Sequence, residues 1–399
     1  MRLLAAGLIL IAIAPSAPSL CSNGSTGSRR ISLLVIGYVS PSYNPFSALA
    51  EQDPLFVYKA YPLPPDLPDP DKRKLDRIYY PRSRRQLVEA YDAIVFTDAR
   101  IRHFSSRQFS DLEYAFRDTG MASVTIHGPS WEHVWSVTVL YDLSPVKDFQ
   151  IRFYLPWRVR FRRDRDPVFL PFVGVGMEKV TGSAYGLMEP KLGSTVWADM
   201  VPQNSPWLVS WRPAGDKPGM QWVFADKFDK DWWALSYGTR GNNPYAIDLC
   251  ANLLLYSLGR PLITDIHARF QAREMLTSFQ TQKGLILSMI EWAEKFGANG
   301  APLNEKLSEL EEEAERAVNY YIQQDYESAI SFMSSMNSRI NAIAEEAVRL
   351  KDAALLWVYF SEWAATCSTF LVSGVLLWSL MVRRRMYRAV EASRLERIR

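Results

Sequence analysis

Four polar residues that follow two predicted strands are the best candidates for chemistry in this sequence: Asp98, His127, Ser130 and His133. Parallel strands bring their carboxyl ends to one edge of a sheet, where α/β proteins usually bind ligands. A serine nucleophile needs small neighbours on a tight turn, whereas the bulky Trp131 directly follows Ser130. A zinc site needs three converging ligands, and the spacing here matches no metal motif. Two interpretations stay open, a polar rim whose histidines form hydrogen bonds to loops and a vestigial ligand pocket made by these four residues. Neither includes a metal, a cofactor or an assigned catalytic residue.

A row of arginines is the second candidate site. Arg158, Arg160 and Arg162 alternate with Val159 and Phe161, which places three guanidinium groups on one face of a predicted strand. Guanidinium groups pair with carboxylates and phosphates, so this face could bind an anionic glycan, a lipid headgroup or an acidic protein. The alternative is an ordinary solvent-exposed strand face, with its charge partly neutralised by nearby aspartates.

The segments that would position these residues alternate between apolar runs and amphipathic stretches. Four short, nearly all-apolar runs predict buried strands: Ile31–Tyr38, Leu55–Ala60, Ala93–Thr97 and Ala122–Ile126. Helices are predicted from Ser83 to Tyr91 and over Arg107–Arg117, each after a capping serine. The proline-dense stretch Pro62–Asp71 predicts a loop. This order of strands and helices predicts a parallel sheet with crossover helices.

The chain changes character in its second half. Trp207–Trp211 and Gln221–Ala225 predict short strands with an antiparallel element, and Tyr245–Leu258 predicts an apolar helix that ends at a glycine. Residues 263–355 show a purely helical pattern, in which an apolar stripe ends near Gln324 and starts again at Tyr326. We expect a helical hairpin or bundle here, packed through its stripe or self-associating through it.

Both ends of the chain carry long apolar runs. Residues 1–20 contain a charged start, the twelve-residue run Leu3–Ala14 and small residues after it, which predicts a signal peptide. Residues 360–382 include twenty uncharged residues edged by tryptophans, enough to span a membrane as a single helix. Three arginines follow at once, so the basic tail 383–399 is predicted to be cytoplasmic and the remainder extracytoplasmic. No helix breaker separates Tyr326 from Val382 except a glycine within the span, which predicts one continuous helix.

The overall composition excludes several classes of protein. Lys and Arg number 46 against 43 Asp and Glu, a balance that is not typical of nucleic-acid-binding proteins. Three widely separated cysteines exclude a disulfide-built scaffold and a cysteine-rich zinc module. Apolar residues make up 48% of the chain, which is enough for a folded core.

The segment from Arg30 to Pro261 resembles the class I glutamine amidotransferase-like superfamily, in its ThuA-like and related amidotransferase branch. The resemblance lies in the first strand, in the strand–helix–strand unit up to Gly128 and in the closing helical segment: Ile31–Tyr38, Tyr91–Asp98, Asn243–Asp248 and Leu258–Pro261. It implies a flavodoxin-like parallel sheet. Active members carry a cysteine nucleophile in the turn after the fourth strand and a His-x-Glu pair near the last strand. Here the turn reads Ile126–Ser130 without cysteine, and Tyr237–Asn242 lacks the pair, which argues against glutamine hydrolysis.

Together these features predict an α/β domain over residues 30–262, a helical bundle over 263–355 and a single transmembrane helix over 360–382. The expected function is binding or assembly at the cell surface by a degenerate amidotransferase-like domain, without enzymatic activity. Two alternatives stay open: a hydrolase of a carbohydrate or amide that acts through His127 and Ser130, and a structural subunit of a larger membrane complex. The expected partners are the lipid bilayer and a protein bound through the bundle, or a second copy, and not nucleic acid.

Overall fold

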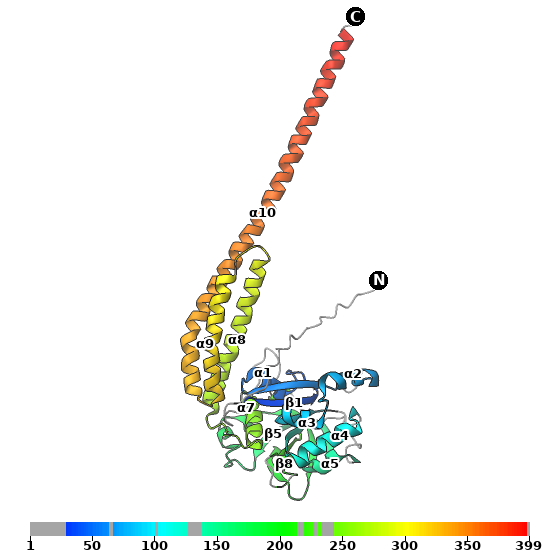
Figure 1. The fold of residues 1–399 in the computed structure, drawn as a ribbon, viewed down its shortest axis with the longest axis vertical. Helices are drawn as coiled ribbons and strands as arrows, with labels where there is room; N and C mark the ends of the chain where they lie inside the picture. The colour runs from blue at the N-terminus through cyan, green and yellow to red at the C-terminus, as the bar shows by residue number, and fades with distance from the viewer. Residues whose placement is uncertain are drawn as a thin grey trace.

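The computed structural model describes residues 29–63, 67–99, 103–126, 137–213, 215, 219–226, 230–233 and 243–396. Within this part of the chain the strands form one nine-stranded sheet in the order β2-β1-β3-β4-β9-β8-β7-β5-β6. We call the sheet and its covering helices, up to residue 263, the α/β body. Three long helices extend from one side of this body, and the last continues far beyond the other two (Figure 1).

One half of the sheet is parallel and buried. Its strands are β1 (Ile31–Gly37), β2 (Phe56–Pro62), β3 (Ala93–Thr97), β4 (Ala122–Ile126) and β9 (Gln221–Phe224). Leu33 of β1 lies opposite Tyr58 of β2 and Ala93 of β3, both in parallel register. Every residue of β3 and β4 is buried, as expected for strands covered on both faces. The four apolar runs are therefore strands as predicted.

Helices connect and cover these strands: α1 (Pro45–Gln52), α2 (Asp69–Tyr79), α3 (Arg84–Ala90), α4 (Ser106–Glu113) and α7 (Ala246–Ser257). Ser83 and Ser105 cap α3 and α4, each accepting a backbone N–H with its side chain. The predicted loop was too long, because α2 begins at Asp69 with Pro70 in its first turn, where proline fits a helix. The predicted helix to Arg117 changes after Glu113 into a π-helical turn, Tyr114–Asp118.

The other half of the sheet is antiparallel, in agreement with the antiparallel element predicted for this region, so the sheet as a whole is mixed and not purely parallel. It contains β5 (Val146–Phe161), β6 (Gly182–Pro190), β7 (Thr195–Val201) and β8 (Ser205–Trp211), with the short helices α5 (Val139–Leu143) and α6 (Lys230–Trp233) beside it. β7 and β8 are joined by residues 202–204, a connection too short for a parallel crossover. The short strands predicted near Trp207 and Gln221 are present as β8 and β9.

Tryptophans fill the core of this half. Fully buried rings come from β5, β8, β9 and α6: Trp157, Trp207, Trp222, Trp232 and Trp233. The ring centroids of Trp207 and Trp232 are 4.9 Å apart, and Trp157 stacks on Trp232. Aromatic rings of this size bury large apolar areas and favour such tilted and stacked pairs. This cluster holds the antiparallel strands against the parallel half.

The three long helices pack into a bundle. They are α8 (Ile266–Glu294), α9 (Ala301–Ile322) and α10 (Tyr326–Glu396). The predicted stripe is buried inside it, with α9 contributing Leu303, Leu307, Leu310, Ala314 and Ala317. We call α8, α9 and residues 326–355 of α10 the stalk. The predicted hairpin is therefore formed by α9 and α10, and α8 is the third helix.

α10 leaves the stalk as a single apolar helix. Its last buried side chain is Ala354, and from Leu356 onward its described side chains are exposed or half-exposed. At about 1.5 Å per residue its 71 residues extend about 107 Å, of which the stalk portion is about 45 Å. Within the described residues this is the one helix long and apolar enough to cross a membrane, with a mean hydropathy of 1.8 over its most apolar window. The continuous helix from Tyr326 through Val382 is confirmed, and residues 1–20 lie outside the described residues.

Candidate functional site

At the carboxyl edge of the parallel strands, the end of β1 packs closely against the end of β3 and hydrogen-bonds to it. Gly37 ends β1 with φ of 109°, and a Cβ there would lie 2.0 Å from the carbonyl oxygen of Thr97, so only glycine fits. Tyr38 donates its N–H to the same carbonyl at 2.8 Å. The Asn44 side chain caps α1 and donates to the Thr97 hydroxyl at 2.8 Å. These contacts hold the ends of β1 and β3 and the start of α1 in fixed positions.

Asp98 stands at this edge, directly after β3, in the predicted position. It is 8% exposed, its φ is 46°, and its N–H donates to the carbonyl of Ile126 at 3.3 Å. A left-handed backbone at a non-glycine residue costs free energy and occurs often at functional sites. His127, Ser130 and His133 lie outside the described residues, so their convergence with Asp98 stays a prediction. Among the described residues no group of three His, Cys, Asp or Glu could hold a metal ion.

Arg158 and Arg160 lie on β5 as predicted and Arg162 directly follows it, but a buried carboxylate lies beside this row. Asp199 of β7, with its side chain 3% exposed, accepts from Arg162 Nε at 2.6 Å and from Arg160 Nη2 at 3.4 Å. The hydrogen bond to Asp199 raises the pKa of Arg162 above its ordinary value. Arg158 contacts the Thr181 hydroxyl at 3.4 Å. Two of the three guanidinium groups thus already have an internal anion, which leaves Arg158 as the least committed of the three.

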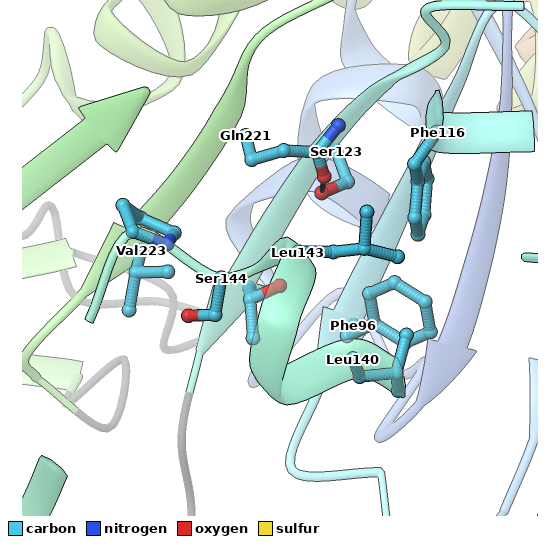
Figure 2. A pocket seen from close by; sticks show the side chains of 10 residues that line it. Phe96, Phe116, Ser123, Leu140, Leu143, Ser144, Gln221 and Val223 are labelled. Carbon is cyan, nitrogen blue, oxygen red and sulfur yellow. Dashed lines mark hydrogen bonds between the residues drawn. The ribbon is translucent and has the colours of Figure 1, made fainter. Parts of the chain in front are cut away.

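A small cavity lies between β4, β9 and α5, away from these residues (Figure 2). Figure 2 shows Leu140 and Leu143 of α5 closing it on one side and Ser123 and Gln221 of the sheet on the other. Its volume is about 20 Å³, enough for about one water molecule. The hydroxyl of Ser123 donates to the Gln221 side chain, which in turn donates to the Met121 carbonyl at 2.9 Å. This cavity is too small for a ligand.

The strongest polar constellation of the described residues lies where the α/β body meets the stalk. Its six members are buried: Asp53, Asp248, Arg269, Arg273, Tyr321 and Tyr326. We call them the joint cluster. They come from five helices or helix ends, since Asp53 caps the end of α1, Asp248 lies on α7 and both arginines lie on α8. The tyrosines lie near the end of α9 and at the start of α10.

Asp53 forms the first half of the joint cluster. Its carboxylate accepts from Arg269 Nη2 and from the Tyr321 hydroxyl, the latter at 2.7 Å. Its other oxygen accepts the Leu55 N–H at 2.9 Å, which also fixes the start of β2. Burial raises the pKa of Tyr321 well above its ordinary value, so the hydroxyl keeps its proton and acts as a donor. Every oxygen of this buried carboxylate is therefore satisfied.

Asp248 forms the second half. It accepts from Arg269 Nε at 3.0 Å and takes two bonds from Arg273, one of them from Nη2 at 3.0 Å. The remaining Arg269 nitrogen, Nη1, donates to the Tyr326 hydroxyl at 3.1 Å. Burial alone would lower the pKa of Arg269, but the neighbouring carboxylates outweigh it and raise that pKa well above its ordinary value. Two carboxylates and two guanidinium groups thus balance in charge, out of contact with water.

Sequence analysis missed this cluster although a signal was present. Arg269 and Arg273 occupy positions on the inner face of α8, together with Ile266, Ala272 and Leu276, all buried. Arginine at stripe positions of a helix indicates buried carboxylate partners, because an unpaired buried charge is strongly unfavourable. The partners themselves could not be named, since Asp53 lies 216 residues before Arg269.

The chemistry available to these sites differs. The joint cluster is buried, and its charged side chains hydrogen-bond to one another, so it can hold the body and the stalk in a fixed relation but cannot bind a substrate. Cys250 is fully buried on α7, where burial raises the pKa of its thiol, so it is not a reactive nucleophile. No protein-family model and no curated protein matches this chain in comparison.

Proposed function

We propose that this protein is a single-pass membrane protein that presents an extracytoplasmic binding or assembly domain on a rigid stalk. The joint cluster carries the proposal, because it ties three helical segments of the stalk to α1 and α7 of the α/β body through buried charged hydrogen bonds. α10 then continues without a break into the apolar segment. Movement of the body would therefore be transmitted to the membrane helix and the basic tail.

The apolar segment supports the membrane part of the proposal. Large apolar and aromatic side chains from Leu356 to Tyr387 stand exposed on the part of α10 beyond the stalk, which packs against no other described residues. Trp357, Phe360 and Trp363 lie at the stalk side, where amphipathic rings favour the membrane interface. The arginines 383–385 on the other side favour a cytoplasmic tail. The α/β body would stand about 45 Å outside the bilayer.

Strand order supports a degenerate amidotransferase-like identity for the α/β body. The parallel strands run β2-β1-β3-β4-β9, which is the 2-1-3-4-5 order of flavodoxin-like sheets when β9 is counted as the fifth parallel strand. The antiparallel strands would then be an insertion between the fourth and fifth strands. The turn after β4 carries no cysteine, and the cysteine of α7 is buried, which favours binding over glutamine hydrolysis.

Distance measurements in lipid test this proposal. Spin labels on exposed positions of the body and the stalk, Lys59→Cys and Asp352→Cys, are placed in full-length protein whose own cysteines are replaced, in lipid discs. We expect one narrow distance distribution by pulsed electron paramagnetic resonance. The Arg269→Met variant should broaden it, whereas Arg339→Met, which removes an exposed stalk ion pair with Glu313, should not. A broad distribution in the parent protein would mean a flexible joint and would contradict rigid presentation.

A further inference from the structure

A basic cleft lies where the end of α2 approaches the start of α4. Its volume is about 410 Å³, within the range of small-molecule sites. The lining residues that matter for binding come from both helices and the segment after α2: Asp76, Arg77, Tyr80, Arg82, Arg107 and Gln108. The cleft includes neither Asp98 nor any member of the joint cluster.

The charge of this cleft is positive. Arg77 and Arg82 are exposed and form no ion pair within the described part of the chain. Asp76 is paired with Lys72 at 3.2 Å and also accepts from the Tyr61 hydroxyl. The buried Asp111, which does not line the cleft, lies 3.5 Å from Arg107 and 3.6 Å from Arg84. In and next to the cleft, five cations (Lys72, Arg77, Arg82, Arg84 and Arg107) therefore outnumber two carboxylates, and the exposed Arg77 and Arg82 are the lining cations without an ion pair among the described residues.

The start of α4 adds a second attraction for anions. Ser105 and Gln108 form a reciprocal capping box, and the eight-residue helix α4 begins at Ser106. Backbone N–H groups at a helix start carry partial positive charge, which stabilises an anion placed there. Arg107 lies in this first turn, and its guanidinium donates to the carbonyl of Arg82, which joins the two walls of the cleft.

Tyr80 supplies the observation that points to a ligand. Its side chain is 6% exposed, and its buried hydroxyl has no hydrogen-bond partner among the described residues. Burial raises the pKa of Tyr80 above its ordinary value, and the nearby Asp111 raises it further, so the hydroxyl is a neutral donor. A buried donor without an acceptor costs free energy. An acceptor oxygen that reached this hydroxyl from the cleft would recover that cost.

We propose that the α2–α4 cleft binds the phosphate group of a small soluble ligand. Arg77 and Arg82 pair with the phosphate oxygens at the opening, and Arg107 and the start of α4 attract it from below. The Tyr80 hydroxyl donates to one of its oxygens. The volume leaves room for an organic group beside the phosphate, against Pro81. The body's position at the far end of the stalk favours a soluble ligand over a lipid headgroup. This choice of a soluble ligand rests on the proposed membrane function, whereas phosphate binding in the cleft does not.

Phosphate titration of the full-length protein in detergent micelles, at low ionic strength, tests the cleft. The probe is inorganic phosphate, followed by calorimetry and by phosphorus NMR line width. We expect saturable binding at one site. Arg77→Gln with Arg82→Gln should weaken it at least about tenfold, because each charge-assisted hydrogen bond contributes about that factor. The control, Arg316→Gln with Arg349→Gln, removes two exposed stalk charges and should change affinity less than about twofold.

Tyr80→Phe separates a binding role from a structural one. The hydroxyl has no partner to lose, so the variant should unfold at the same or a higher temperature than the parent. It should nevertheless bind phosphate about three- to tenfold more weakly. Absence of saturable binding overturns the proposal. Equal weakening by the stalk control also overturns it, as does unchanged affinity in both cleft variants.

Discussion

The joint cluster predicts a large and specific loss of stability when Arg269 is replaced by methionine. Methionine keeps an apolar stem of similar length but removes the bonds to Asp53, Asp248 and Tyr326. Asp248 keeps Arg273, whereas Asp53 keeps only neutral donors, the Tyr321 hydroxyl and the Leu55 N–H. The variant therefore contains one buried carboxylate without a cation. Removing one member of a buried ion pair costs about 3–5 kcal/mol, so we expect a decrease of that size in the free energy of unfolding.

Urea unfolding of the full-length protein in detergent, followed by tryptophan fluorescence, measures this loss. The matched control is Arg339→Met, which removes an exposed ion pair with Glu313 on the same stalk and should cost less than about 1 kcal/mol. A second variant separates charge from packing. Adding Asp53→Asn to Arg269→Met removes the uncompensated charge, so the double variant should be more stable than Arg269→Met alone by about 1–3 kcal/mol.

Two results would refute this reasoning. If Arg269→Met costs no more than Arg339→Met, the buried bonds do not hold the body to the stalk. If Asp53→Asn destabilises Arg269→Met further, the cost arises from lost packing and not from an uncompensated carboxylate. The same samples serve for the distance measurements, in which a destabilised joint should broaden the distribution.

Three further predictions concern pH, the buried thiol and topology. Burial raises the pKa of Tyr91 to about 12, so the unfolded chain loses this proton first and the free energy of unfolding should fall as pH rises from about 10 toward 12. Tyr91→Phe should reduce this fall, measured as the urea midpoint against pH. An unchanged dependence on pH would contradict the assignment to Tyr91. Cys250→Ala should lower the free energy of unfolding by about 1 kcal/mol, measured by thermal unfolding. The parent protein should release no ammonia from glutamine. Release that depends on a cysteine would contradict the proposal of a degenerate site. Protease added to intact cells should remove the α/β body and spare the tail after Arg383, and full protection of the body would reverse the proposed orientation.

Local features of the fold could be predicted because local physics decides them. Short apolar runs became β1 to β4, and Ser83 and Ser105 became helix caps through bonds to N–H groups three residues away. The absence of proline from Tyr326 onward allowed one helix of 71 residues. The apolar stretch that is long enough to cross a membrane could be predicted because its length and apolarity are properties of the sequence alone.

The candidate sites could be predicted only in part. Asp98 was placed correctly at the carboxyl edge, since every parallel strand ends there. The arginine row was correctly placed on one strand face, but its pairing with Asp199 of β7 depends on which strand lies beside β5. Similarly, the prolines around Pro68 suggested only a loop, although Pro68 is the N-cap residue of α2 and Pro70 lies in its first turn.

An antiparallel element was predicted, but the order and pairing of its strands and the joint cluster were decided by tertiary structure alone. β9 pairs with β4 only after the chain has formed four other strands, a choice that depends on contacts across the sheet and on the tryptophan core. Arg269 is tolerable in the core only because Asp53, 216 residues earlier, and Asp248 meet it there. The free energy of a buried charge depends on all of its neighbours in the folded protein, and these cannot be identified from the local sequence around it.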